Sequence, residues 1–200
     1  MTSVTHGSTM PAKRTSERYG GVAIALHWLT ALLIVCGFTL GLSMVGLPIG
    51  RQKLQWYAWH KWIGITVFLL SCARLAWRRT HAAPSPLAAM PAWQQRSSLL
   101  VHGALYALLL AIPLSGWIYS SSTGVQVVYL GVLPLPDLVP KDRALAIGLR
   151  ALHLTLNFTL FTLVCVHTAA ALKHHFVDRD TVLRRMLPPS RPAIQGKGPR

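Results

Sequence analysis

Residues 151–172 read ALHLTLNFTLFTLVCVHTAAAL, an apolar stretch that holds two histidines, His153 and His167, fourteen positions apart. An α-helix has 3.6 residues per turn and rises 1.5 Å per residue, so fourteen positions are just under four turns. The two imidazoles therefore share one helix face, at levels about 21 Å apart. This spacing predicts that one helix supplies a ligand to each of two stacked cofactors.

The composition places this helix in a membrane. Of the 200 residues, 52% are hydrophobic and 12% are charged, and the mean hydropathy is +0.41. A helix needs about 20 apolar residues to cross the hydrocarbon core of a bilayer. Four stretches approach or exceed that length: residues 22–43, 56–77, 99–119 and 151–172. The first is too long for a signal peptide, and no small-residue cleavage pattern follows it. The expected fold is an all-α integral membrane four-helix bundle.

The basic residues predict its orientation. Of 20 Lys and Arg residues, fourteen fall on the side of the bundle that holds both termini. The six on the other side are Arg51, Lys53, Lys61, Lys141, Arg143 and Arg150. Because cytoplasmic loops retain Lys and Arg, both termini are expected to be cytoplasmic. The net charge is +15, and the basic residues that produce it flank the apolar spans. Membrane lipid is therefore the expected partner, and nucleic acid is not.

The chain divides into three parts. Residues 1–18 are expected to be a mobile basic segment, residues 19–187 a single transmembrane domain, and residues 188–200 a disordered basic tail. The longest connection, residues 120–140, is rich in Gly and Pro and is expected to be a functional lid or a mobile segment. A helix is expected to restart at residues 141–142 and to run unbroken into the fourth span.

Counting from the span ends pairs the buried histidines by depth. His27 and His167 each lie five residues in from the cytoplasmic end of their spans. His60 lies four residues, and His153 two residues, from the outer end of theirs. The prediction is an inner pair, His27 with His167, and an outer pair, His60 with His153. For each histidine taken singly, the alternative is a hydrogen bond to a neighbouring helix and nothing else.

The donor set of these pairs favours haem. Zinc prefers four tetrahedral ligands that include Cys, Asp or Glu, whereas the four spans contain no acidic residue. Two imidazoles that face each other suit haem iron, whose other four ligands come from the porphyrin. No Cys-x-x-Cys-His motif is present for covalent attachment. Two haems b bound between the helices are the predicted cofactors, with His102 as an alternative to His27 at the inner level.

Several short motifs together resemble the bacterial cytochrome b-561 family. They are Leu26-His27-Trp28, then His60-Lys61-Trp62-Ile63-Gly64 followed by Arg74, then His102 with Tyr106, Pro113 and Gly116, and finally His153-x-Thr-Leu and HTAAALKHHF at 167–176. The resemblance covers about residues 18–188. It implies a four-helix dihaem protein of the bacterial inner membrane that exchanges electrons with the quinone pool. It also implies His27, His60, His153 and His167 as the iron ligands, and so favours His27 over His102.

Basic groups near each level have candidate roles. Arg51 and Lys53 are expected near the outer haem, where they would bind propionates or attract an anionic one-electron donor such as superoxide. Arg18, His102 and His174 are expected near the inner haem, beside propionates or a quinone headgroup. Ordinary flanking charge is the alternative for each basic group taken singly.

Three functions are therefore open. The first is an electron carrier or quinone oxidoreductase with an unknown donor. The second is a cytochrome b anchor that relays electrons for a catalytic subunit, a separate dehydrogenase or hydrogenase. The third is a transporter or proton channel whose buried histidines titrate, which the absence of acidic residues in the spans disfavours. A homodimer is compatible with each.

Overall fold

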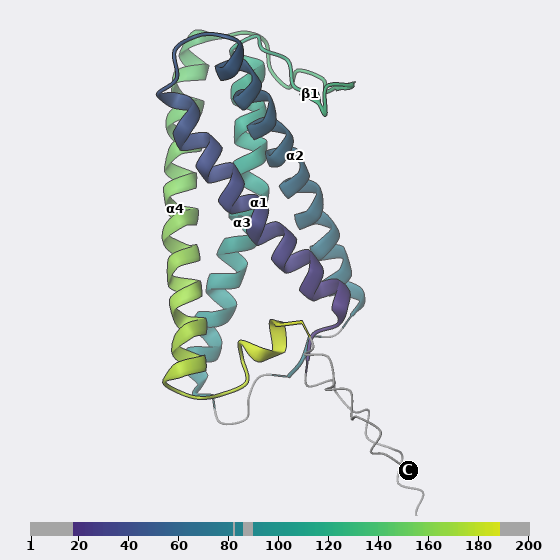
Figure 1. The fold of residues 1–200 in the computed structure, drawn as a ribbon, viewed down its shortest axis with the longest axis vertical. Coiled ribbons are helices and arrows are strands. Elements are labelled where there is room, and N and C mark those ends of the chain that lie inside the picture. The colour runs from purple at the N-terminus through teal and green to yellow at the C-terminus, as the bar shows by residue number, and fades with distance from the viewer. Residues whose placement is uncertain (1–17, 82, 86–89, 189–200) are drawn as a thin grey trace, which may run out of the picture.

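The computed structural model describes residues 18–81, 83–85 and 90–188. Four long helices run side by side: α1 Gly21–Val45, α2 Arg51–Thr80, α3 Ala92–Ser122 and α4 Arg143–Phe176 (Figure 1). Each contains one of the apolar stretches and extends beyond it, so the four-helix bundle predicted from the sequence is confirmed. Nearly all of the two terminal segments that the sequence predicts to be mobile, residues 1–17 and 189–200, lies outside the described residues.

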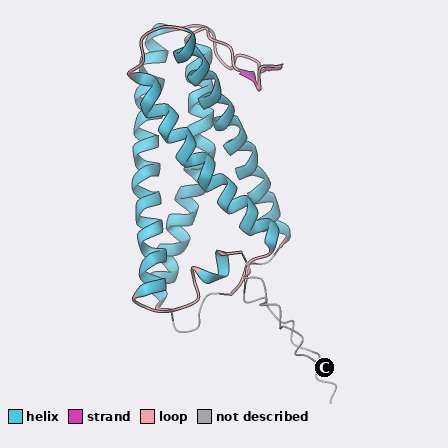
Figure 2. Cartoon of the chain, viewed as in Figure 1, coloured by secondary structure: helices cyan, strands magenta, loops and turns pink. Residues whose placement is uncertain are grey.

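The ends of the bundle differ in what they carry. We call the end with the α1–α2 turn and the start of α4 the hairpin end, because strands β1 Val128–Tyr129 and β2 Leu133–Pro134 lie there. The tail end has the start of α1, the end of α4 and the 3-10 helix η1 Arg184–Met186. Helices fill most of the described chain, and the strands form only a small projection (Figure 2).

α4 begins where the sequence predicts. Asp142 is its N-cap, and one carboxylate oxygen accepts a hydrogen bond from the backbone N–H of Leu145 at 3.0 Å. An aspartate in this position satisfies one of the backbone donors that the first turn leaves unpaired. The helix then continues without a break to Phe176, so one rigid element carries both His153 and His167.

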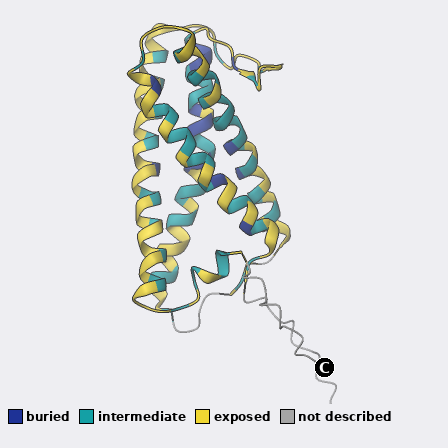
Figure 3. Ribbon diagram, viewed as in Figure 1, coloured by how far each residue is buried: buried dark blue, intermediate teal, exposed yellow. Residues whose placement is uncertain are grey.

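The surface of the bundle is apolar, as a lipid-facing surface requires. Much of α4 and part of α1 are yellow, exposed ribbon in Figure 3. The exposed apolar side chains of these two helices include Leu32, Val35 and Phe158. Among the described residues, α1, α3 and α4 are long and apolar enough to cross a membrane. α2, the remaining predicted span, is of similar length but carries Lys61 and Arg74 within the predicted stretch, which lower its hydropathy.

A small core occupies the middle of the bundle. Val67 of α2, Leu108, Leu109 and Ile112 of α3, and Leu160 of α4 pack together. Leu160 lies midway between His153 and His167 along α4, so this core separates the two histidine levels. The hydroxyls of Thr30 and Ser71, both fully buried, donate to carbonyl groups one turn back in their own helices, which satisfies them inside an apolar interior.

The 120–140 connection contains regular structure that the sequence does not predict. β1 and β2 pair antiparallel, and the turn between them places Leu130 and Gly131 at φ 53° and 77°. Two indole N–H groups hold the connection to the bundle: Trp62 donates to the Val128 carbonyl at 2.7 Å, and Trp117 donates to the Pro136 carbonyl at 3.1 Å. The connection is therefore fastened to α2 and α3.

Candidate functional site

The helices bring four histidines into two pairs at two levels. At the hairpin end, the ring centroids of His60 from α2 and His153 from α4 lie 6.3 Å apart. At the tail end, the centroids of His27 from α1 and His167 from α4 are also 6.3 Å apart. Both pairs thus bring together residues from helices remote in sequence, and α4 contributes to each.

The hydrogen bonds at the hairpin end fix the tautomer of both imidazoles. Nδ1 of His60 lies 3.0 Å from the Gly37 carbonyl, which only accepts, so Nδ1 carries the proton. Nδ1 of His153 lies 3.0 Å from Oγ of Ser115, whose own proton goes to the Ile112 carbonyl at 2.8 Å. His153 therefore donates from Nδ1 as well. In each neutral ring Nε2 keeps its lone pair, as a metal ligand must.

Two glycines make room for these rings. A Cβ atom added to Gly116 of α3 would lie 3.0 Å from Cε1 of His153, and one added to Gly41 of α1 would lie 3.2 Å from Cε1 of His60. Ordinary carbon contacts are about 3.5–4.0 Å, so any larger residue would push the imidazole aside. The absence of side chains at these positions lets each ring lie against the backbone of a neighbouring helix.

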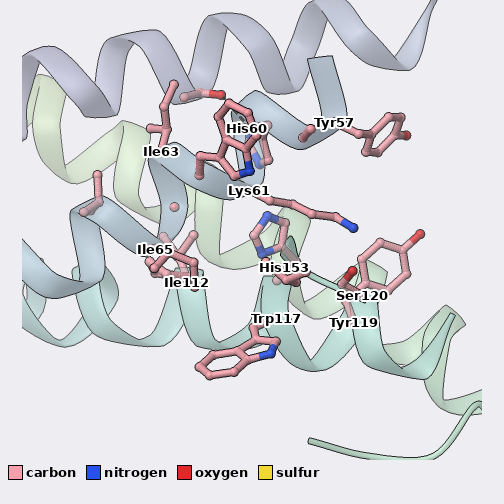
Figure 4. Close-up of a pocket in the computed structure, with 18 of the residues that line it drawn as sticks. Tyr57, His60, Lys61, Ile63, Ile65, Ile112, Trp117, Tyr119, Ser120 and His153 are labelled. Carbon is pink, nitrogen blue, oxygen red and sulfur yellow. Dashed lines mark hydrogen bonds between the residues drawn. The ribbon is translucent and has the colours of Figure 1, made fainter. Parts of the chain in front are cut away.

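The hairpin-end pair lies in a cavity of about 540 Å³ (Figure 4). Most of its wall is apolar: Leu33, Ile34, Phe38, Ile63, Val67, Leu109, Ile112 and Leu160 are among the lining residues. Apolar pockets of this kind, with a few placed polar groups, are typical of cofactor sites. The wall also includes Val125, Gln126, Val127 and Val128, so the 120–140 connection closes one side of the cavity.

This geometry fits an iron held between two imidazoles. Two nitrogens bound on opposite sides of one metal, at about 2 Å each, place the ring centroids about 6 Å apart. The observed 6.3 Å at both levels agrees with that separation. The donors are two neutral nitrogens with no carboxylate or thiolate beside them in the cavity wall, a set that suits haem better than zinc.

The tail-end level holds a third histidine. The ring centroid of His102 from α3 lies 5.2 Å from that of His167, and Nδ1 of His102 donates to the Ser98 carbonyl at 2.6 Å. Nη2 of Arg74 donates to Nδ1 of His27 at 3.0 Å. Because a guanidinium only donates, Nδ1 of His27 accepts here and Nε2 carries the proton. Metal binding through Nε2 of His27 therefore requires that Arg74 exchange this contact for another.

Arg74 is a residue that the sequence reasoning missed as a neighbour of His27. A fourteen-residue interval in the sequence could have revealed it. Arg74 follows His60 by fourteen residues on α2, as His167 follows His153 on α4. That interval places the guanidinium on the histidine face of α2, one level down. Its guanidinium also lies over the Tyr106 ring, at 5.2 Å from the ring centroid.

The other sequence-predicted residues lie away from the cavity. The Lys53 ammonium donates to the carbonyls of Leu47 at 2.7 Å and Val45 at 3.4 Å, which closes the end of α1. Arg51 lies at the exposed start of α2. At the tail end, Arg18 donates to the Leu187 carbonyl at 2.7 Å, and His174 pairs with Asp180 at 2.6 Å. Of the described residues, those that line the hairpin-end cavity include none of these four.

Comparison with known proteins shows the family to which this chain belongs. Residues 18–189 match the family model described as prokaryotic cytochrome b561. The chain belongs to the prokaryotic cytochrome b561 family. It is therefore a membrane electron-transfer protein of a family that binds b-type haem, and the resemblance noted in the sequence is confirmed.

Three curated relatives cover nearly the whole chain. Cytochrome b561 homolog 2 of Escherichia coli (strain K12) is 36% identical over 182 residues, which are 89% of this chain and 95% of the relative. Cytochrome b561 homolog 1 of the same strain is 30% identical over 86% of this chain and 98% of the relative. A protein of Yersinia pestis named probable superoxide oxidase CybB is 28% identical over 88% of this chain and 98% of the relative.

Ser115 is expected to support haem binding through His153. Replacing Ser115 with alanine removes the acceptor for the Nδ1–H of His153, and loss of such a partner typically weakens metal binding about 10- to 100-fold. We expect faster transfer of one haem from the purified protein to apomyoglobin. Ser71→Ala is the matched control, since Ser71 is equally buried but bonds only to its own helix. Equal transfer rates in the two variants would contradict this role.

Proposed function

We propose that the protein carries electrons between a one-electron donor at the hairpin end and the quinone pool, through two haems b. His60 and His153 would hold the haem at the hairpin end, and His27 and His167 would hold the one at the tail end. The observation that carries the proposal is the equal ring separation of 6.3 Å in two histidine pairs that share α4. His27 is preferred to His102 because its separation from His167 matches that of the hairpin-end pair.

Held between two imidazoles, a haem b would supply reversible one-electron exchange. The residues of this chain hold and orient it. Gly37 and Ser115 keep the proton on Nδ1 of the two hairpin-end rings, and the packed residues around Ile112 exclude water. Only Leu160 and the few side chains packed against it separate the two histidine levels, so the path for an electron between the two levels is short.

Superoxide is the proposed donor. The name of the Yersinia pestis relative supports it, and the hairpin end carries Arg51, Lys61, Lys141, Arg143 and Arg150, which would attract a small anion. Two superoxide ions would each give up one electron and leave as dioxygen. One quinone would take those two electrons and two protons to become a quinol. Attraction of this kind weakens as salt is added.

The proposed orientation follows the charge distribution. The tail end, with both termini, would face the cytoplasm of a bacterial cell, and the hairpin end would face outward across the inner membrane. This assignment rests on the fourteen Lys and Arg residues on the tail side against six on the other. Quinone would exchange electrons with the protein from within the bilayer.

The decisive experiment is the reduced-minus-oxidised absorption spectrum of the purified protein, combined with a haem-to-protein ratio. Two low-spin haems per chain are expected. A protein that binds none would sink the proposal and leave the histidine-dependent transporter. If the loaded protein alone reduces quinone with superoxide, it acts as a quinone oxidoreductase. If it does so only with a catalytic subunit, it is the anchor of a larger complex.

A further inference from the structure

Lys61 extends into the cavity that holds the hairpin-end histidines. In Figure 4 its side chain runs past His153 and ends toward Tyr119, and Lys61 is among the lining residues. The described hydrogen bond of its ammonium is to the Val125 carbonyl at 3.5 Å, longer than the usual 2.7–3.2 Å of an N–H···O bond. An ammonium has three protons to donate, so this single weak contact leaves most of its capacity for another acceptor.

The carboxylates of the described chain do not supply that acceptor. Asp178 and Asp180 pair with Lys173 and His174 at the opposite end of the bundle, and Asp142 caps α4. Asp137 is exposed, and it attracts the Lys61 ammonium electrostatically. No hydrogen bond between Asp137 and Lys61 is among the described contacts. A cation in an apolar surrounding requires a nearby anion. Among the described residues, no carboxylate is therefore hydrogen-bonded to the half-buried Lys61 ammonium, which can pair with an anion that enters the cavity.

We infer that Lys61 is the anchor for a carboxylate of the porphyrin at the hairpin end. The inference rests on the proposed function, because it requires a haem b between His60 and His153. That cofactor has an apolar ring, which matches the apolar wall, and carboxylates at one edge, which match the one ammonium in the wall. Lys61 follows His60 directly, so consecutive residues supply the iron ligand and the anion partner. The pair would fix how the porphyrin is turned about the axis that joins the two imidazoles.

A small anionic electron donor that diffuses into the cavity is the other anion that could pair with Lys61. The test therefore compares native haem with haem dimethyl ester, in which both carboxylates are blocked. Each cofactor is loaded into the full-length protein and into the variants Lys61→Met, Lys61→Arg and Lys53→Met. Lys53→Met is the control, since Lys53 also lies near the start of α2 but donates to carbonyls at the end of α1.

In the unmodified protein, esterification is expected to weaken binding at the hairpin-end site about 10- to 100-fold, the factor that one charge-assisted hydrogen bond supplies. In Lys61→Met, esterification should have little further effect, because the partner is already gone. Lys61→Arg and Lys53→Met should keep the sensitivity to the ester. The midpoint potential of the hairpin-end haem should shift downward in Lys61→Met, since loss of a nearby cation favours the oxidised form, and should not shift in Lys53→Met.

Equal sensitivity to the ester in the unmodified protein and in Lys61→Met would overturn the inference. So would a Lys61→Met variant that keeps its potential and its ester sensitivity but reacts more slowly with superoxide, with a weaker salt dependence, because Lys61 would then serve the diffusing anion. Failure of the proposed function looks different: the unmodified protein would bind fewer than two haems. Two bound haems without coupling between Lys61 and the carboxylates would overturn only the role of Lys61.

Discussion

Replacing His153 with alanine is expected to halve the haem content of the purified protein, from two haems per chain to one. The substitution removes one axial ligand at the hairpin end and leaves His60 without an opposing imidazole. The tail-end pair lies about 21 Å away along α4, beyond the packed core around Leu160, and should keep its cofactor. The measurement is the haem-to-protein ratio with the reduced-minus-oxidised spectrum of the remaining haem.

Companion variants make this result specific. His60→Ala should remove the same haem as His153→Ala, and the double variant should lose no more than either single one. His167→Ala should remove the other haem. His81→Ala, at the exposed end of α2, should keep both. Loss of both haems from His153→Ala, or different remaining spectra for His60→Ala and His153→Ala, would contradict the pairing of these two residues.

The helices and the levels of the histidines were predictable because both depend on regular geometry. In lipid, an apolar stretch of about 20 residues is expected to form a helix. The helix rise per residue then gives the depth of each position in the membrane. That is why His60 and His153 were expected to meet. The same counting, applied to His60 and Arg74, would have placed Arg74 beside the tail-end histidines.

The partners of each imidazole were not predictable, because they depend on how each helix is rotated about its axis. α1 is apolar all round, so its sequence does not say which face packs against α2. The structure turns Gly37 and Gly41 toward α2, where the Gly37 carbonyl accepts from His60 and Gly41 leaves room for the ring. Their small-xxx-small spacing is also typical of simple helix packing, and sequence alone cannot separate the two uses.

The hydrogen bond of Asn157 and the position of the two short strands were also not predictable. Asn157, one turn after His153, carries an amide that is long enough to reach a neighbouring helix. It donates instead to the His153 carbonyl of its own helix at 2.7 Å. The strands β1 and β2 have two residues each, too few for an alternating pattern to be recognised. Their position depends on the indole of Trp62, a contact from a distant part of the chain.

Replacing Gly116 with alanine is expected to remove most of the hairpin-end haem without unfolding the bundle. The new methyl group would lie 3.0 Å from Cε1 of His153, closer than a carbon contact allows. Since backbone surrounds the methyl group on the α3 side, the imidazole has to turn. Turning it breaks the Nδ1–H bond to Ser115 and changes the placement of the ring opposite His60. The haem-to-protein ratio measures the loss.

Gly103→Ala is the matched control on the same helix. A Cβ atom at Gly103 meets nothing within 4 Å, so the substitution there should keep both haems and, if anything, stabilise α3 by up to about 1 kcal/mol through helix propensity. Gly41→Ala, where the contact to His60 is 3.2 Å, should give a smaller loss than Gly116→Ala. If Gly116→Ala retained two haems with an unchanged spectrum, the close packing of His153 against α3 would not be what holds that ligand in place.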